Sequence, residues 1–154
     1  LEVTVRHTER EYLNGLSERI KKIFEGAALC TGTTVEVEFY GNPYDDMNQN
    51  NRGTALIEEV MTDMGLDFEP GPAALGGSSD IGNVSYQCAA FHPKLRLAGE
   101  PKVCHSKEFA AAMLEPTIEQ TITDGANIIG GTVLRLVEKP ALLEEIVAEF
   151  NNSK

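Results

Sequence analysis

LEVTVRH occupies residues 1–7 and VEVEFY occupies residues 35–40, and these two stretches decide the predicted fold. Apolar side chains fall on every second residue in both, which is the pattern of a strand with one buried face. Between them, apolar residues recur at helical spacing up to Gly32, a natural helix end. Thr8 with Glu11 three residues later predicts a capping box at the helix start. The first forty residues therefore predict a strand–helix–strand unit with a right-handed crossover.

The rest of the chain predicts a second part. Turn-forming and polar residues fill positions 41–51 (GNPYDDMNQNN), which predicts a hinge or linker between domains. A strand is predicted over 84–97, interrupted at His92-Pro93. Gly130-Gly131 predicts the close approach of another helix or strand. Helices are predicted over 54–64, after a Ser106 cap, over 117–138, and from Pro140 to about Phe150.

Composition limits the classes of function. The chain has 154 residues, of which 42% are hydrophobic and 24% charged, as expected for a globular protein. The sequence contains no apolar run of the roughly 20 residues that a bilayer crossing needs, so no membrane partner is expected. A net charge of −11 argues against nucleic acid as a partner. Three cysteines without C-x-x-C spacing predict a reduced, cytoplasmic protein.

The stretch 77–86 (GSSDIGNVSY) is the first candidate for a binding site. Ser79, Asp80 and Asn83 offer a hydroxyl, a carboxylate and an amide to a substrate. No Gly-Lys-Ser/Thr follows, so a phosphate loop is not indicated, and the G-x-S-x-G pattern of a nucleophile elbow is broken. A well-capped loop without a ligand remains the alternative.

Two histidines are further candidates. His92, beside Pro93, is interpreted either as a histidine bonded to a carbonyl or as a contact to substrate. His105 lies just before a predicted helix start, where a neutral imidazole makes a good metal ligand. The alternative for His105 is an exposed histidine near a helix N-terminus.

Three motifs, in order along the chain, resemble the amidohydrolase branch of the zinc peptidases (family M-twenty): residues 77–86, FHP at 91–93 and CHSKEF at 104–109. That family includes p-aminobenzoyl-glutamate hydrolases, aminoacylases and auxin-conjugate hydrolases. The resemblance implies an α/β fold. Residues 1–41 would be the second half of an α/β-sandwich lid that also mediates dimerisation. Residues 42–154 would be the C-terminal segment of a mixed-sheet catalytic domain.

The resemblance also implies a two-zinc site, with His105 as its last ligand. Ser79, Asp80, Asn83 and His92 are then expected on the substrate side of the cleft. In family members a His-x-Asp motif and a Glu-Glu pair that carries the general base precede the lid, and the chain begins at the lid. We therefore expect a missing N-terminal part of the parent protein, no catalytic residue within this chain, and no activity of the chain alone.

We expect this chain to be part of a metal-dependent amidohydrolase or peptidase. Its substrate would be a small-molecule amide, either an N-acyl amino acid or a small peptide. The alternative is a non-catalytic binding or assembly domain. In either case we expect a homo-oligomer.

Overall fold

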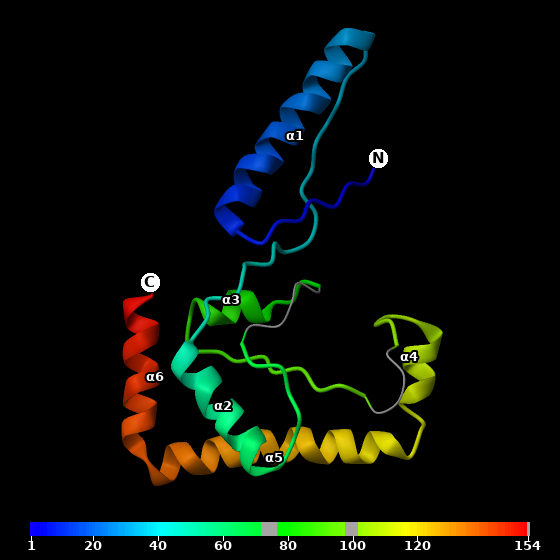
Figure 1. Cartoon of the computed structure of the whole chain (residues 1–154). Helices are drawn as coiled ribbons and strands as arrows, with labels where there is room; N and C mark the ends of the chain where they lie inside the picture. The colour runs from blue at the N-terminus through cyan, green and yellow to red at the C-terminus, as the bar shows by residue number, and fades with distance from the viewer. Residues whose placement is uncertain (72–76, 98–101, 154) are drawn as a thin grey trace. The chain divides into compact units, whose positions relative to one another are not determined.

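The computed structural model describes residues 1–71, 77–97 and 102–153, and the regular elements in these ranges are all helices (Figure 1). They are α1 (Arg10–Thr31), α2 (Asn51–Asp63), α3 (Ile81–Ser85), α4 (Lys107–Ala112), α5 (Thr117–Glu138) and α6 (Pro140–Asn152). The chain divides into two compact units. Unit 1 comprises Leu1–Asn48 and Ser78–Gln87, and unit 2 comprises Gln49–Gly77 and Cys88–Lys154.

The predicted α/β fold is wrong for the described residues. Residues 1–7, 34–40 and 84–97 form no strand, so neither the strand–helix–strand half of a sandwich nor a mixed sheet is found in the described ranges. A strand needs hydrogen bonds from the backbone of a neighbour, and no backbone hydrogen bond links 1–7 or 34–40 to a described residue. Alternation identifies an apolar face, but it does not supply the partner strand, and two strands alone are only marginally stable.

Unit 1 is built around α1. The helix ends as predicted, because Gly32 adopts a φ of 69° and the Thr33 amide donates to the Ala28 carbonyl at 2.9 Å. Its start differs from the prediction. Glu9 is the N-cap residue and its amide donates to Nδ1 of His7 at 3.1 Å, so the capping box is wrong.

Two segments flank α1. We call residues 1–7 the N-terminal arm and residues 34–40 the return arm. After Gly32 the chain runs back alongside α1 (Figure 1). A helix of 22 residues is about 33 Å long, and about ten residues of extended chain cover that length. The return arm is therefore extended even though it pairs with no strand.

Unit 2 is held together by the mutual packing of α2, α5 and α6. Ile57 and Met61 of α2 meet Ile128 of α5, and partly buried apolar side chains surround them: Met64, Leu66, Phe68, Phe91 and Leu95. A Cβ on Gly131 would lie 3.0 Å from Cγ1 of Val60, which confirms at this position the close approach predicted for Gly130-Gly131.

Helix ends in unit 2 agree with the cap residues in the sequence. The Ser106 hydroxyl accepts a hydrogen bond from the Phe109 amide at 3.0 Å, so the predicted cap of α4 is confirmed. The helix predicted over 117–138 is present as α5, and Pro140 occupies the first turn of α6. None of the helices that the structure describes has both the length and the apolar character needed to cross a bilayer.

The start of α2 is tied to α6 by side chains. Asn50 is buried, and its Oδ1 accepts a hydrogen bond from the Gly53 amide at 2.9 Å while its Nδ2 donates to the Ile146 carbonyl at 2.8 Å. The Glu149 carboxylate accepts from the amides of Asn51 and Arg52, both at 2.8 Å. These contacts satisfy amides that a helix start otherwise leaves without partners.

We expect Asn50→Ala to lower the free energy of unfolding by about 2 kcal/mol, because it removes a helix cap and a buried hydrogen bond to Ile146. Urea denaturation followed by circular dichroism measures this. Asn127→Ala, at an exposed position of α5, is the matched control and should change stability by no more than about 0.7 kcal/mol. Equal effects of the two substitutions would contradict the capping role.

Hydrogen bonds from two backbone amides lower the pKa of the Glu149 carboxyl below its usual 4.5. The bond from the Arg52 amide has the larger effect and the bond from the Asn51 amide the smaller. A lowered pKa means that the folded state favours the ionised carboxylate. Its stabilising contribution is therefore present above about pH 4.5 and is lost as the pH falls through the folded-state pKa. We expect Glu149→Gln to be less stable than the wild type at pH 7 and the difference to shrink below pH 4.5. Denaturation curves at several pH values test this, and a difference independent of pH would contradict it.

Candidate functional site

The stretch 77–86 folds as a loop followed by the short helix α3, and its residues from Ser78 on belong to unit 1. Gly77 has a φ of 84°, a conformation that favours glycine. A Cβ on Gly82 would lie 2.0 Å from the carbonyl oxygen of Asp45, which leaves no space for any side chain there. Glycine at position 82 thus allows α3 to rest directly on the backbone of the segment 43–48.

Asn83 fixes the same contact by hydrogen bonds. Its Nδ2 donates to the Pro43 carbonyl at 3.1 Å and to Oδ2 of Asp45 at 3.2 Å, and its Oδ1 accepts from the Asp45 amide at 3.3 Å. The side chain predicted to contact substrate is therefore engaged on both its oxygen and its nitrogen in this structure.

Ser85 is a residue whose part the sequence interpretation missed. It is fully buried, and its Oγ donates to the Gly82 carbonyl at 2.6 Å and accepts from the Asn48 amide at 2.9 Å. The signal in the sequence is the small, polar G-N-x-S pattern over 82–85. Asn83 and Ser85 of this pattern bond to peptide groups of the irregular segment 43–48.

Ser79 and Asp80 lie before α3 and are less constrained. The Ser79 hydroxyl donates to Oδ1 of Asp80 at 3.2 Å and accepts from the Ile81 amide at 3.4 Å. Asp80 is exposed, and its side chain makes no capping bond to α3. Of the three candidates in this stretch, these two keep polar groups toward solvent.

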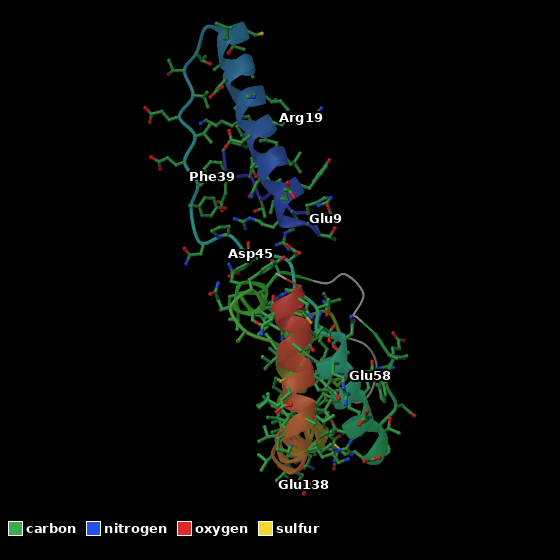
Figure 2. The ribbon with its side chains drawn as sticks, turned by 90° about the vertical axis from the view of Figure 1, so that its left-hand side faces the viewer. Glu9, Arg19, Phe39, Asp45, Glu58 and Glu138 are labelled. Carbon is green, nitrogen blue, oxygen red and sulfur yellow. The ribbon has the colours of Figure 1, made fainter. Side chains whose placement is uncertain are left out.

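Asp45 and Asp46 connect α3 to the start of α1, and Figure 2 shows Asp45 near that start. Oδ1 of Asp46 accepts from the Arg10 amide and Oδ2 from the Tyr86 hydroxyl, both at 3.1 Å. The Arg10 guanidinium donates to the Tyr44 carbonyl at 2.9 Å and lies 3.4 Å from Oδ1 of Asp45. Partial burial, followed by the bond to Asp46, raises the pKa of Tyr86, so its phenol stays a neutral donor at physiological pH.

These residues line a depression of about 530 Å³ in unit 1. Its wall carries four carboxylates, from Glu9, Glu11, Asp45 and Asp46, and the guanidinium of Arg10. All four carboxylate oxygens of Asp45 and Asp46 already have partners, so the role of this pair is structural: it links the start of α1 to α3.

His92 belongs to unit 2 and is exposed. Its neighbours on the irregular segment 88–97 are anchored. A Cβ on Gly53 would lie 2.0 Å from the Phe91 ring, and a Cβ on Gly125 would lie 3.2 Å from Cδ1 of Leu95. The segment is held by packing at these two points, and the imidazole between them is presented to solvent.

His105 also belongs to unit 2 and is exposed, in the turn before α4. Its φ of 64° is in the left-handed region, and it is the one described residue other than glycine with a positive φ. This conformation costs about 1–3 kcal/mol at a residue other than glycine, and such strain concentrates at functional sites. Histidine adopts this region more often than most residues other than glycine, so the predicted functional role of His105 stays a prediction.

The described residues do not form a complete zinc site. Over the ranges that the structure covers, no three His, Cys, Asp or Glu side chains come together in a way that could hold a metal ion. Zinc in proteins takes three or four such ligands. His105 is therefore not part of a group of three such side chains within the described residues.

Comparison with known proteins finds two relatives of the same name. No family model matches the chain. It is similar to the Xaa-Arg dipeptidase of Mus musculus, 29% identical over 141 residues, and to that of Homo sapiens, 27% identical over 141 residues. Both matches cover 90% of this chain and 32% of the relative, so the chain spans about a third of the length of these proteins. The similarity supports a relationship to peptidases.

We expect Gly82→Ala to destabilise unit 1 by about 1–3 kcal/mol, since the added Cβ overlaps the Asp45 carbonyl, a backbone atom that cannot swing away. Hydrogen exchange of residues 43–48 and 81–86 measures the effect. Gly26→Ala is the matched control, because a Cβ there meets nothing within 4 Å. It should stabilise α1 by up to about 1 kcal/mol. Unchanged protection of 43–48 in Gly82→Ala would show that α3 does not hold this segment.

Proposed function

We propose that this chain forms part of a peptidase that hydrolyses the amide bond of a dipeptide or an N-acyl amino acid. The observation that carries the proposal is the similarity to two proteins named Xaa-Arg dipeptidase over 90% of the chain. Those names suggest a dipeptide with a C-terminal arginine as the first substrate to test. The motifs at 77–86, 91–93 and 104–109 support the same class.

Ser79, Asp80 and His92 are the proposed contacts to the substrate. Asp80 and His92 are exposed, and Ser79 is partly exposed with its hydroxyl bonded to Asp80 and to the Ile81 amide. The Asn83 amide is already engaged by Pro43 and Asp45, so we propose that it positions the loop before α3.

His105 is the proposed ligand for zinc. The strained backbone at this residue and the capped start of α4 hold the imidazole in a defined turn. Zinc in hydrolases polarises the amide carbonyl and acidifies bound water. Because the described residues offer no complete ligand set, we assign no catalytic residue here and propose that the 154-residue chain alone is inactive.

Association of copies is a second candidate function. α5 and α6 expose Ile122, Ile129, Val133, Leu134, Val137, Leu143 and Val147. Exposed apolar residues on adjoining helices are a common basis for protein–protein contact. We propose a homo-oligomer, and a cytoplasmic location in view of three exposed cysteines that form no disulfide among the described residues.

The test compares the 154-residue chain with the protein as its gene encodes it, on Xaa-Arg dipeptides and N-acyl amino acids. We expect chelator-sensitive hydrolysis by the encoded protein and none by the chain. His105→Ala should lower activity more than about 100-fold and zinc content with it, since even supporting residues of metal ligands cost 10–100-fold.

His92→Ala is the control in that protein. It should retain its zinc and raise KM, because we assign it a contact to substrate and no metal. Full zinc content with near wild-type activity in His105→Ala would remove the metal assignment. Absence of hydrolysis by the encoded protein, together with oligomers in light scattering, would favour the assembly function.

A further inference from the structure

The proposed substrate contacts Ser79 and Asp80 are attached to the backbone of α3. The Ser79 carbonyl accepts a hydrogen bond from the Gly82 amide at 3.4 Å, and the Asp80 carbonyl accepts one from the Val84 amide at 3.2 Å. α3 has five residues, and helices shorter than about 12 residues are only marginally stable by themselves in water. The place of Ser79 and Asp80 therefore depends on the contacts that hold α3 from outside.

Most of these contacts join α3 to the segment 43–48. Gly82 rests on the backbone of this segment, and the Asn83 and Ser85 side chains bond to its peptide groups. All three residues fall within one short stretch of α3. A helix that is held only over such a stretch is still able to tilt about it.

Tyr86 adds a contact at the end of α3, where it is the C-cap residue. Its hydroxyl donates to Oδ2 of Asp46 at 3.1 Å, and Oδ1 of the same carboxylate accepts from the amide of Arg10, the first residue of α1, at the same distance. One carboxylate thus connects the end of α3 with the start of α1. Tyr86 is 39% exposed, so it is no core residue, and its hydroxyl has a defined partner.

We propose that Tyr86 is a positioning residue for the substrate. Its hydrogen bond to Asp46 restrains the tilt of α3 at the end opposite to Ser79 and Asp80, and so sets the direction of these two side chains. Tyr86 acts through α3 and is not itself a contact to the substrate. The inference rests on the proposed peptidase function and adds to it a residue to which that function gave no part.

The first test is physical and uses the 154-residue chain. Tyr86→Phe removes the hydroxyl and leaves the ring. We expect hydrogen exchange at the Gly82 and Val84 amides to become about three- to tenfold faster, as the loss of one hydrogen bond implies, with unchanged exchange in α2 and α5. Tyr44→Phe is the matched control, because Tyr44 is 47% exposed and its hydroxyl bonds to no described residue.

The second test measures kinetics in the protein as its gene encodes it. Tyr86→Phe should raise KM for the dipeptide or N-acyl amino acid about three- to tenfold and leave kcat within about twofold, because it disturbs groups that bind the substrate and no reacting atom. Zinc content should stay at the wild-type level. When Ser79 and Asp80 are both replaced by Ala, Tyr86→Phe should raise KM no further, since residues that act through one another are not additive.

Asp46 supplies the conservative comparison. In Asp46→Asn the amide oxygen can still accept from the Arg10 amide, and the Nδ2 group can donate to the Tyr86 hydroxyl oxygen, so KM should stay close to that of the wild type. Asp46→Ala loses both bonds and should raise KM at least as much as Tyr86→Phe does.

Faster exchange at Gly82 and Val84 with an unchanged KM would overturn the proposal, because the bond would then serve stability alone. An equal rise in KM with and without Ser79 and Asp80 would also overturn it. If the wild type is active and exchange in Tyr86→Phe is unchanged, only the positioning role fails. If the zinc-loaded wild type hydrolyses none of these substrates, the proposed function fails and the positioning role fails with it.

Discussion

The peptide groups of the irregular segment 43–48 need hydrogen-bond partners, and the arrangement of unit 1 depends on how they obtain them. Buried or half-buried amides without partners cost about as much as lost hydrogen bonds. Here the partners are side chains of α3: Asn83 serves Pro43 and Asp45, and Ser85 serves Asn48. Gly82 allows this, because any Cβ would push α3 off the Asp45 carbonyl. The segment 43–48 is thereby fixed to α3 although it has no regular structure.

This constraint separates two kinds of polar residue within one motif. Members on the helix side, at 82–85, face the backbone that they hold and have little left for a ligand. Members on the loop side, Ser79 and Asp80, bond chiefly to each other and face solvent. The same logic applies in unit 2, where Phe91 and Leu95 are anchored by packing and His92 between them is presented. In both units the anchoring residues and the predicted binding residues therefore lie close together in the sequence.

Helix ends, which depend on neighbouring residues in the sequence, were predictable. Strands, which need a second segment of backbone to pair with, were not. Ser106, Pro140 and Gly32 act on neighbouring residues, and the helix ends that they mark are present. Thr8 is not the cap, because α1 begins at Arg10 and Glu9 is its N-cap residue. Alternation at 1–7 and 35–40 could not establish a sheet, since pairing depends on a second backbone. For the candidate site, Ser79, Asp80 and His105 were chosen from the sequence by chemical type and stay predictions, whereas the burial of Ser85 and the left-handed φ of His105 depend on three-dimensional packing.

Unit 1 has a further energetic consequence. Most of the stability of a helix in a protein comes from packing of its apolar face, and α1 has no buried residue although its apolar side chains line a depression beside the two arms. Any binding partner that covers these side chains in the folded unit, and not in the unfolded chain, must stabilise unit 1 by mass action.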